Sequence, residues 1–376
     1  MAPAHTVHDE ARMLRARVLV ALLVLAVCGH ELIAQNVSTP RAELTAAPSL
    51  RLTGSADSNS PAVWQRIGGQ NQMLVLTSID GRPSLASGAQ LRTLGQPSPI
   101  VMQPWPGGGV WMEAVVADDN GMLYGYYHNE MGATVCGDDG DGKVIPRIGA
   151  ARSRNHGATW EPLGLVLEAP PGTYDCDTSN VYFVGGVGDF TVRLDPESRD
   201  LYFFYSQYIK FDRLQGVGVA RLAWADRDNP SGRVMVWNSR TWLPARAIPL
   251  VNGKVRWVYP AAVPIFPAVE PWHDDDSEVD ALWGPSVHWN TYLQQYVMLL
   301  NHAKDAAWTQ EGVYVSFAPR INDPTLWTKP VKLLDGGAWY PQVMGLEDGS
   351  GTDKDAGRWA RFFMGGISEH LIQFVK

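Results

Sequence analysis

The chain repeats one layout five times, and this repeat constrains its fold more than any other feature. Each unit opens with a short apolar run, turns at a polar segment and returns as a strand rich in aromatic residues. The five hairpin-like units cover residues 60–78, 112–129, 188–207, 284–301 and 340–366. Short apolar or alternating runs between Gly, Asn, Asp and Pro are typical of strands, so the chain is expected to be all-β.

A second layout follows the three middle hairpins. Residues 148–167, 217–237 and 312–334 each contain a strand of small and β-branched residues, a polar turn, a tryptophan and another strand. Units two, three and four are therefore expected to have four strands each. Unit one can be completed by residues 83–90 and 97–103, whereas unit five lacks a fourth strand, which residues 49–54 can supply.

Four-stranded antiparallel units repeated five times predict a five-bladed β-propeller. An N-terminal strand that completes the last blade closes the ring and removes its exposed edge. A β-sandwich is the alternative, but the regularity of the units argues against it. The residues in excess of minimal blades lie mainly in 130–146, 168–186 and 238–282, and the last of these is expected to be a long loop over one face.

Residues 1–34 are expected to be an export signal. Arg12, Arg15 and Arg17 precede an apolar run at 18–27 that is too short to span a bilayer. Residues 25–28 also resemble a bacterial lipobox, so a lipid anchor on Cys28 and an uncleaved anchor are the alternatives. Residues 35–376 would then form one secreted or periplasmic propeller domain without a membrane span, working as a monomer.

The remaining two cysteines are Cys136 and Cys176, and an even count in an exported protein predicts a disulfide between them. Two separate buried thiols are the alternative. Residues 138–142 have oxygen ligands at a calcium-like spacing but lack the closing Glu of an EF-hand. We expect a solvated turn there, with a structural calcium as the alternative, and no other cofactor or metal.

The formal net charge is −8, and the sequence contains no basic stripe, which argues against nucleic-acid binding. In a propeller, the first strand of each blade lines the central channel. Asp57, Glu113 and Asp189 stand at three of the five inner-strand starts, so they are expected to converge at one mouth. Like charges raise one another's pKa, which can turn a carboxyl group into a general acid. When each carboxylate is considered alone, a structural role, in which it accepts hydrogen bonds from backbone amides of a loop, is an equally good interpretation.

Aromatic and polar side chains flank these carboxylates. Flat apolar faces with polar edges suit a sugar, and paired carboxylates suit glycoside hydrolysis. The predicted substrate-binding residues are Trp111, His128, Trp283, His288, Asn290, Trp339, Tyr340 and Gln342.

The layout resembles the five-bladed β-propeller glycoside hydrolases of the arabinanase, β-xylosidase and invertase type. The resemblance implies that Asp57, in Ser-Ala-Asp-Ser-Asn-Ser, is the base or nucleophile. It also implies that Asp189, in Val-Gly-Asp-Phe, modulates the pKa of the general acid or stabilises the transition state. The sequence Trp-Met-Glu-Ala around Glu113 is similar to the Trp-Ala-Pro-acid motif of blade two.

One departure from the family concerns the general acid, a Glu that often precedes Gly-Pro at the start of blade four. Here Trp283 stands before Gly284-Pro285. Glu113 is the first candidate to replace that acid, and Glu278 and Asp280 are the next.

Residues 153–160, Ser-Arg-Asn-His-Gly-Ala-Thr-Trp, resemble the sialidase Asp-box with Asn155 in place of Asp. That motif is a turn between the outer strands of a blade, so it supports a propeller without indicating a substrate. The leading hypothesis is a secreted glycoside hydrolase that cleaves a plant or microbial glycan. A non-catalytic carbohydrate-binding propeller, favoured by Trp283, and an extracytoplasmic scaffold are the alternatives.

Overall fold

The computed structural model describes residues 39–140, 142–273 and 278–376. Pro40–Val375 form one compact unit. The predicted export signal and Cys28 lie outside the described residues, as does Asp141 of the predicted turn at 138–142. In the described part of the chain, no helix is long and apolar enough to cross a membrane. The helical turns found there are short 3₁₀ segments, Leu91–Thr93, Thr134–Gly140, Asp212–Leu214, Trp224–Asp226 and Pro324–Leu326.

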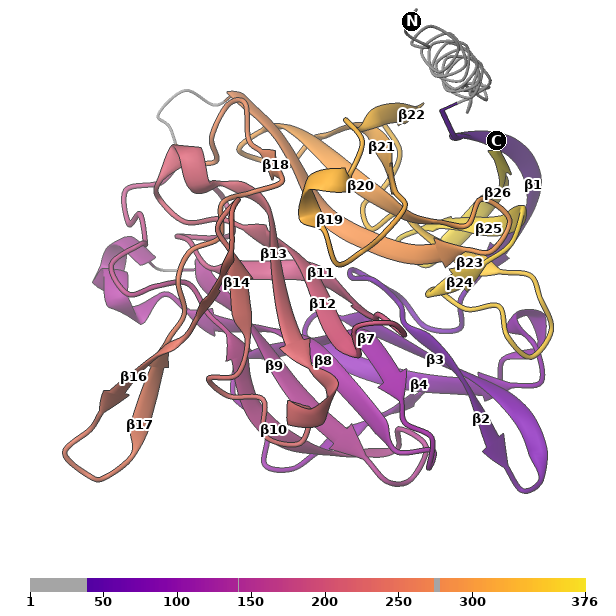
Figure 1. The fold of residues 1–376 in the computed structure, drawn as a ribbon, viewed down its shortest axis with the longest axis horizontal. Coiled ribbons are helices and arrows are strands. Elements are labelled where there is room, and N and C mark those ends of the chain that lie inside the picture. Colours follow the sequence, from indigo (N-terminus) through magenta and orange to yellow (C-terminus); the bar gives the residue numbers. More distant parts are fainter. Residues whose placement is uncertain (1–38, 141, 274–277) are drawn as a thin grey trace, which may run out of the picture. The chain divides into compact units, whose positions relative to one another are not determined.

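Five sheets follow one another as the blades of a β-propeller (Figure 1), which confirms the predicted fold. The first strand of each blade is the innermost of its four strands, with the short β24 added beside that of blade four, and neighbouring inner strands contact one another. The inner strands are β2 (Ala62–Ile67), β7 (Gly109–Ala117), β11 (Val187–Leu194), β19 (Glu278–Asn290) and β23 (Gln342–Gly345).

The second strand of each blade pairs antiparallel with the inner one, and the third pairs antiparallel with the second. The second strands are β3 (Gln70–Ile79), β8 (Leu123–Gly132), β12 (Asp200–Gln207), β20 (Gln295–Asp305) and β25 (Trp359–Met364). The third strands are β4 (Arg82–Gly88), β9 (Val144–Ser153), β13 (Gly216–Ala223), β21 (Gln310–Ala318) and β26 (Ile367–Val375).

The outer strands complete the four-stranded blades, and a few short strands add to them. The outer strands are β5 (Ser98–Pro99), β10 (Thr159–Leu167), β14 (Met235–Trp237), β22 (Val331–Asp335) and β1 (Arg41–Arg51). The short β6 (Val101–Met102) and β24 (Asp355–Ala356) pair in parallel with β10 and β19. In blade three, β15 (Trp242–Pro244) extends the sheet and β18 (Phe266–Pro267) pairs with β13.

The N-terminal strand β1 closes blade five, as predicted, but it lies earlier in the sequence than expected. It pairs antiparallel with β26 from Arg41, opposite Val375, to Arg51, opposite Ile367. Only the start of residues 49–54 therefore belongs to the strand. The partner strand sets the register, and the pairing extends as far as β26 does.

Hydrophobic clusters join each blade to the next. Because the last cluster joins blade five to blade one, buried hydrophobic contacts close the ring together with β1. The clusters contain, in order, Leu74 with Met112, Tyr126 with Phe203, Phe204 with Met298, Leu299 with Phe362, and Met344 with Val75.

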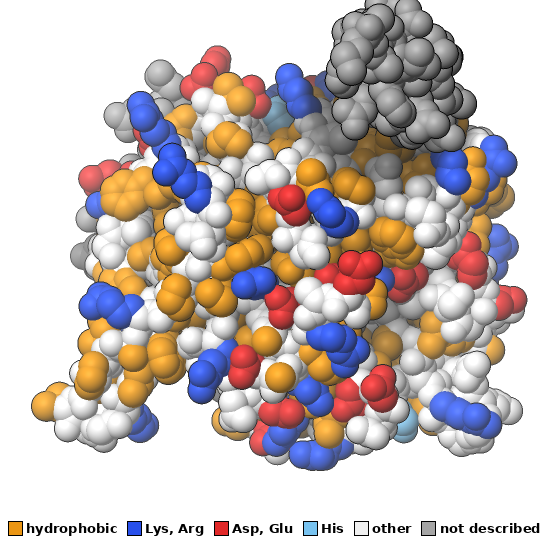
Figure 2. Space-filling model, viewed as in Figure 1, with side chains coloured by type: hydrophobic (Ala, Val, Ile, Leu, Met, Phe, Trp, Pro, Cys, Tyr) orange, Lys and Arg blue, Asp and Glu red, His pale blue; other side chains and the backbone are white. Residues whose placement is uncertain are grey.

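Residues 238–282 differ from the expected single covering loop. After β15, the two-stranded ribbon of β16 (Arg246–Pro249) and β17 (Val255–Val258) extends away from the blades (Figure 1). The chain then returns to pair through β18. The part around Trp272 packs into an aromatic cluster beside the inner strands, Trp242 and Phe266 pack into the cluster between blades three and four, and residues 278–282 already belong to β19. Figure 2 shows acidic and basic side chains interspersed on the viewed face.

The disulfide between Cys136 and Cys176 is present, as predicted, with its Cα atoms 5.4 Å apart. It ties the 3₁₀ turn after β8 to the segment that precedes β11. The segment at 153–160 forms the turn between β9 and β10. There, Trp160 is buried and its Nε1 donates to the Gly157 carbonyl at 2.7 Å.

Candidate active site

Backbone irregularities on the inner strands turn two of the three predicted carboxylates out of the regular pleat. The pairing of β7 with β8 slips at Glu113, and the pairing of β11 with β12 slips at Asp189. A β-bulge re-aims the side chain of the extra residue, and bulges are frequent next to active sites. The corresponding slip in β19 falls at Gly284-Pro285, directly after Trp283.

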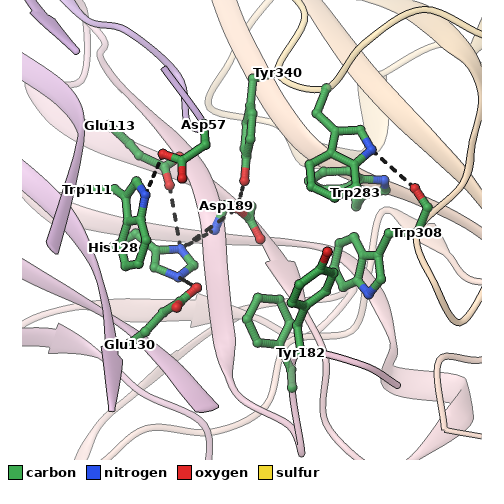
Figure 3. Close-up of a pocket in the computed structure, with 12 residues that line it drawn as sticks. Asp57, Trp111, Glu113, His128, Glu130, Tyr182, Asp189, Trp283, Trp308 and Tyr340 are labelled. Carbon is green, nitrogen blue, oxygen red and sulfur yellow. Dashed lines mark hydrogen bonds and ion pairs between the residues drawn. The ribbon is translucent and has the colours of Figure 1, made fainter. Parts of the chain in front are cut away.

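A cavity of about 170 Å³ lies at this mouth of the ring. Figure 3 shows Asp57, Glu113 and Glu130 at one side, and Trp283 and Trp308 at the other. Carboxylates therefore face an aromatic wall. The cavity is lined by Asp57, Trp111, Glu113, His128, Glu130, Tyr182, Phe183, Asp189, Trp283, Trp308, Trp339 and Tyr340.

Three predicted binding residues lie elsewhere among the described residues. His288 is buried on β19, with its ring 5.3 Å from that of Phe374. Asn290 binds the turn that follows β19, where its side-chain oxygen accepts from the backbone of Leu293 at 2.8 Å. The amide of Gln342 exchanges two hydrogen bonds with the backbone of Ser60, between the neighbouring blades five and one. These side chains hold the blades together.

Four residues of the cavity were not anticipated from the sequence. Glu130 stands two residues after His128 on β8, and strand alternation could have placed both on one face. Tyr182 and Phe183 belong to the segment that the disulfide anchors. Trp308 comes from the turn after β20, where no periodic pattern indicates the direction of a side chain.

Three residues that line the cavity have strained backbone. Asp189, Trp308 and Tyr340 have positive φ angles of 41°, 64° and 58°, although none of them is glycine. Such conformations cost on the order of 1–3 kcal/mol each. Five other described residues that do not line the cavity share the feature, namely Asp80, His156, Arg199, Ser239 and Gln294, so the strain does not by itself mark the cavity.

Asp57 is half-buried at the rim of the cavity. Its carboxylate accepts from Trp111 Nε1 at 2.6 Å and from the backbone N–H of Asp80 at 3.2 Å. Burial raises the pKa of Asp57, while these two hydrogen bonds oppose the rise. The hydrogen bonds leave it suited to act as an ionised base or nucleophile.

Glu113 is buried, with 1% of its surface exposed. One oxygen accepts from the backbone N–H of Phe190 at 2.8 Å, and the other lies 3.5 Å from His128 Nδ1. Burial raises the pKa of Glu113 well above its ordinary value, and the neighbouring charge of Asp189 raises it further. Glu113 is therefore the carboxyl group best placed to hold a proton near neutral pH.

Asp189 is held by two tyrosines. Tyr208 donates to Oδ2 at 2.6 Å, and Tyr340 donates to Oδ1 at 2.9 Å. Burial raises the pKa of Asp189, whereas the nearby His128 and both hydroxyl groups lower it. Hydrogen bonds to the charged form favour that form, so Asp189 is better prepared than Glu113 to remain ionised.

His128 is oriented by hydrogen bonds to both of its ring nitrogens. The backbone N–H of Asp189 donates to Nδ1 at 3.0 Å, and Nε2 lies 3.1 Å from the Glu130 carboxylate. The surrounding carboxylates favour a second proton on the ring. That proton would sit on Nδ1 and meet the Asp189 N–H, so the arrangement described here is that of the neutral ring with its hydrogen on Nε2.

Glu113, His128 and Asp189 also place possible ligand atoms within 4.8 Å of one another in the described part of the chain. The single lone pair of His128 Nδ1 is already engaged, since it accepts from the Asp189 N–H, and its Nε2 faces Glu130, so the imidazole has no lone pair left to bind a metal at this place. The residues as arranged do not fit a metal ion.

Trp283 occupies the place where the resemblance leads one to expect the general acid. It is buried, and its ring meets those of Trp308 and Trp339 edge-on at 4.7 and 5.5 Å. The other two candidates do not line the cavity in the described structure. Glu278 is exposed, and Asp280 accepts from His302 Nε2 at 2.7 Å. Glu113 is thus the candidate that lies at the site.

No known family description and no curated protein sequence matches the chain. Solved structures do. Several are named as glycoside hydrolases, and one is named as an N-acetylgalactosamine deacetylase. An endo-arabinase from Bacteroides thetaiotaomicron is 10% identical with a TM-score of 0.48, covering 87% of this chain and 96% of that chain.

An exo-β-1,3-galactanase from Phanerochaete chrysosporium is 12% identical, with a TM-score of 0.46 over 87% of this chain and 63% of that chain. A family 117 glycoside hydrolase from Zobellia galactanivorans is 12% identical, with a TM-score of 0.45 over 89% and 90%. The assignment of the fold depends on the chain's own strand pairing, and its chemistry on its own residues.

Proposed function

We propose that the protein is a secreted glycoside hydrolase that cleaves glycosidic bonds of a plant or microbial glycan. The observation that carries this proposal is the convergence of Asp57, Glu113 and Asp189, from three different blades, on one cavity with an aromatic wall. Acid–base chemistry on a sugar needs one protonated and one ionised carboxyl group beside an apolar face.

In the proposed reaction, Glu113 donates its proton to the glycosidic oxygen as the bond from that oxygen to the anomeric carbon breaks. Asp57 either takes a proton from the water that attacks the anomeric carbon or attacks that carbon itself. In the second case, water then hydrolyses the covalent intermediate and Glu113 recovers its proton. Asp189 stays ionised, and its charge favours retention of the proton on Glu113.

The aromatic wall supplies the binding energy in this proposal. Trp339 is half-buried and presents ring surface on which the apolar face of a sugar can stack, while the buried Trp283 and Trp308 support that ring by edge-on contacts. The disulfide fits an oxidising compartment, which supports the expected export.

The test is hydrolysis of a panel of aryl glycosides and plant and microbial glycans by the wild type and by Asp57→Asn and Glu113→Gln. Each variant is expected to lose at least about 100-fold in kcat/KM, as for the loss of a general acid or base. Asp119→Asn is the matched control, because Asp119 is exposed in the β7–β8 turn. Unchanged turnover in both site variants would overturn the proposal.

A carbohydrate-binding propeller without hydrolysis is the second candidate. The presence of Trp283 in place of an acid favours it, since a tryptophan lines the cavity without supplying an acidic proton. It predicts that glycans bind without turnover and that Glu113→Gln leaves their affinity unchanged.

A further inference from the structure

A repeated hydrogen bond links each of the first four blades to the next. A side chain of a second strand accepts a backbone N–H from the next inner strand or from the residues just before it. The pairs are Met112 N–H with Ser78 at 3.0 Å, Asp189 N–H with His128 at 3.0 Å, Gly284 N–H with Ser206 at 2.9 Å and Tyr340 N–H with Asn301 at 3.1 Å.

His128 is the exception in this series. Serine hydroxyls and an asparagine amide satisfy the same backbone group in the other blades, so an imidazole is not needed for it. The ring is 2% exposed, and it faces carboxylates from three directions. Its nitrogens lie 3.5 Å from Glu113 on β7, 3.9 Å from Asp189 on β11 and 3.1 Å from Glu130 on its own strand.

The remaining described neighbours of His128 and Glu113 carry no positive charge. The rings of Trp111 and Phe183 lie 5.5 and 6.4 Å from the imidazole. Asp57 lies on the same side of the cavity as Glu113 and adds negative charge near it, and the hydroxyls of Tyr208 and Tyr340 are directed at Asp189. In the described site, the imidazole is thus the basic group among four carboxyl groups.

We propose that His128 is the proton partner of Glu113: the two groups hold one acidic proton between them, and Glu130 is the counter-charge of the protonated ring. When Glu113 carries the proton, the ring is neutral and Nδ1 accepts the Asp189 N–H. When Glu113 is ionised, a proton taken up from solvent on Nδ1 replaces that N–H and faces Glu113.

This inference deepens the proposed hydrolysis and depends on it for its catalytic meaning. After Glu113 has protonated the leaving group, its buried negative charge would stand beside that of Asp189. An imidazolium 3.5 Å away compensates that charge, which makes Glu113 a stronger acid. Among Glu113, His128 and Glu130, it is Glu130 that contacts water, since 23% of its side chain is exposed.

The first experiment does not require activity. In protein labelled with ¹⁵N-histidine, the ring nitrogens of His128 are followed by NMR against pH and assigned with His128→Asn. In Glu113→Gln and in Glu130→Gln, the apparent pKa of His128 is expected to fall by about one unit or more, since each variant removes a nearby carboxylate. Midpoints within about 0.3 units of the wild type in both variants would overturn the proposal.

The second experiment uses His128→Asn, which can still accept the Asp189 N–H as Asn301 accepts that of Tyr340. The variant lacks the second site for the shared proton, so its basic kcat/KM limb is expected at lower pH, with a loss of about tenfold or more for poor leaving groups and little for dinitrophenolate. Asp119→Asn, in the exposed β7–β8 turn, is the control, and its basic limb should not move. A limb at unchanged or higher pH in His128→Asn would contradict the inference, whereas a wild type without hydrolysis would instead contradict the proposed function.

Discussion

The hydroxyl of Tyr208 donates to Oδ2 of Asp189 at 2.6 Å, and both residues are buried in the same blade. This bond stabilises the charged form of a carboxylate whose pKa is raised by burial. In Tyr208→Phe, the pKa of Asp189 is therefore expected to rise, and the acid limb of the pH–rate profile should move to higher pH. The free energy of unfolding should fall by about 1–2 kcal/mol, as measured in urea.

Tyr126→Phe is the control for that variant. Tyr126 is also buried, and its hydroxyl has no hydrogen-bond partner in the part of the chain that the structure describes. Removing it should leave both the acid limb and the unfolding free energy near their wild-type values. Equal shifts in the two variants would mean that loss of the hydroxyl acts through packing and not through Asp189.

The blades could be predicted because their information is local. Alternation, turn residues and an aromatic return strand recur in each unit, and four inner strands start within three residues of the predicted place. The inner strand of blade four, β19, starts at Glu278, six residues before its predicted start and inside the segment predicted to be a loop. The closing strand was placed too late because its register depends on β26, at the other end of the chain. The ribbon of β16 and β17 was missed because a Pro-rich segment shows no clear alternation.

The cavity was less predictable, because its members depend on three-dimensional detail. His128 and His288 both lie on strands, but a bulge in the next blade brings Asp189 to the first, while the second is buried beside Phe374. Trp308 enters through a turn with a positive φ, which its sequence does not indicate. Placement at the starts of inner strands, in contrast, was enough to bring the three carboxylates into one cavity.

The disulfide is expected to stabilise the aromatic side of the cavity. It closes a separation of 40 residues and anchors the segment that contributes Phe183. The chain-entropy relation gives about 4 kcal/mol for a loop of that length. In Cys136→Ser/Cys176→Ser, calorimetry should show a lower Tm, and glycan affinity should fall more than kcat does. A reductant should lower the Tm of the wild type but not that of the double variant.

Strand β1 is expected to be required for a monomeric fold. It covers the edge of β26 along Arg41–Arg51, and an uncovered edge strand pairs readily with other chains. Deleting residues 40–51 should produce aggregates in size-exclusion chromatography or a loss of the cooperative unfolding transition. Replacing Arg41 and Glu43 by Ser is the milder control, because it removes an exposed ion pair of 2.8 Å and keeps the strand. A monomeric, cooperatively folded deletion variant would show that closure is not needed.

His288 is expected to make the fold acid-sensitive. Burial, followed by the charges of Arg193 and Lys354, lowers its pKa to about 3, against about 6.5 in an unfolded chain. Between these values the unfolded chain binds a proton that the folded chain does not. The contribution of this group to the free energy of unfolding is complete above pH 6.5 and is lost as the pH falls, by about 1.4 kcal/mol per pH unit.

Urea unfolding from pH 7 to 4 should therefore show a smaller loss of unfolding free energy for His288→Leu than for the wild type. His156→Leu, in a half-buried turn, should follow the wild type. Parallel curves for the wild type and His288→Leu would mean that His288 does not titrate differently in the two states.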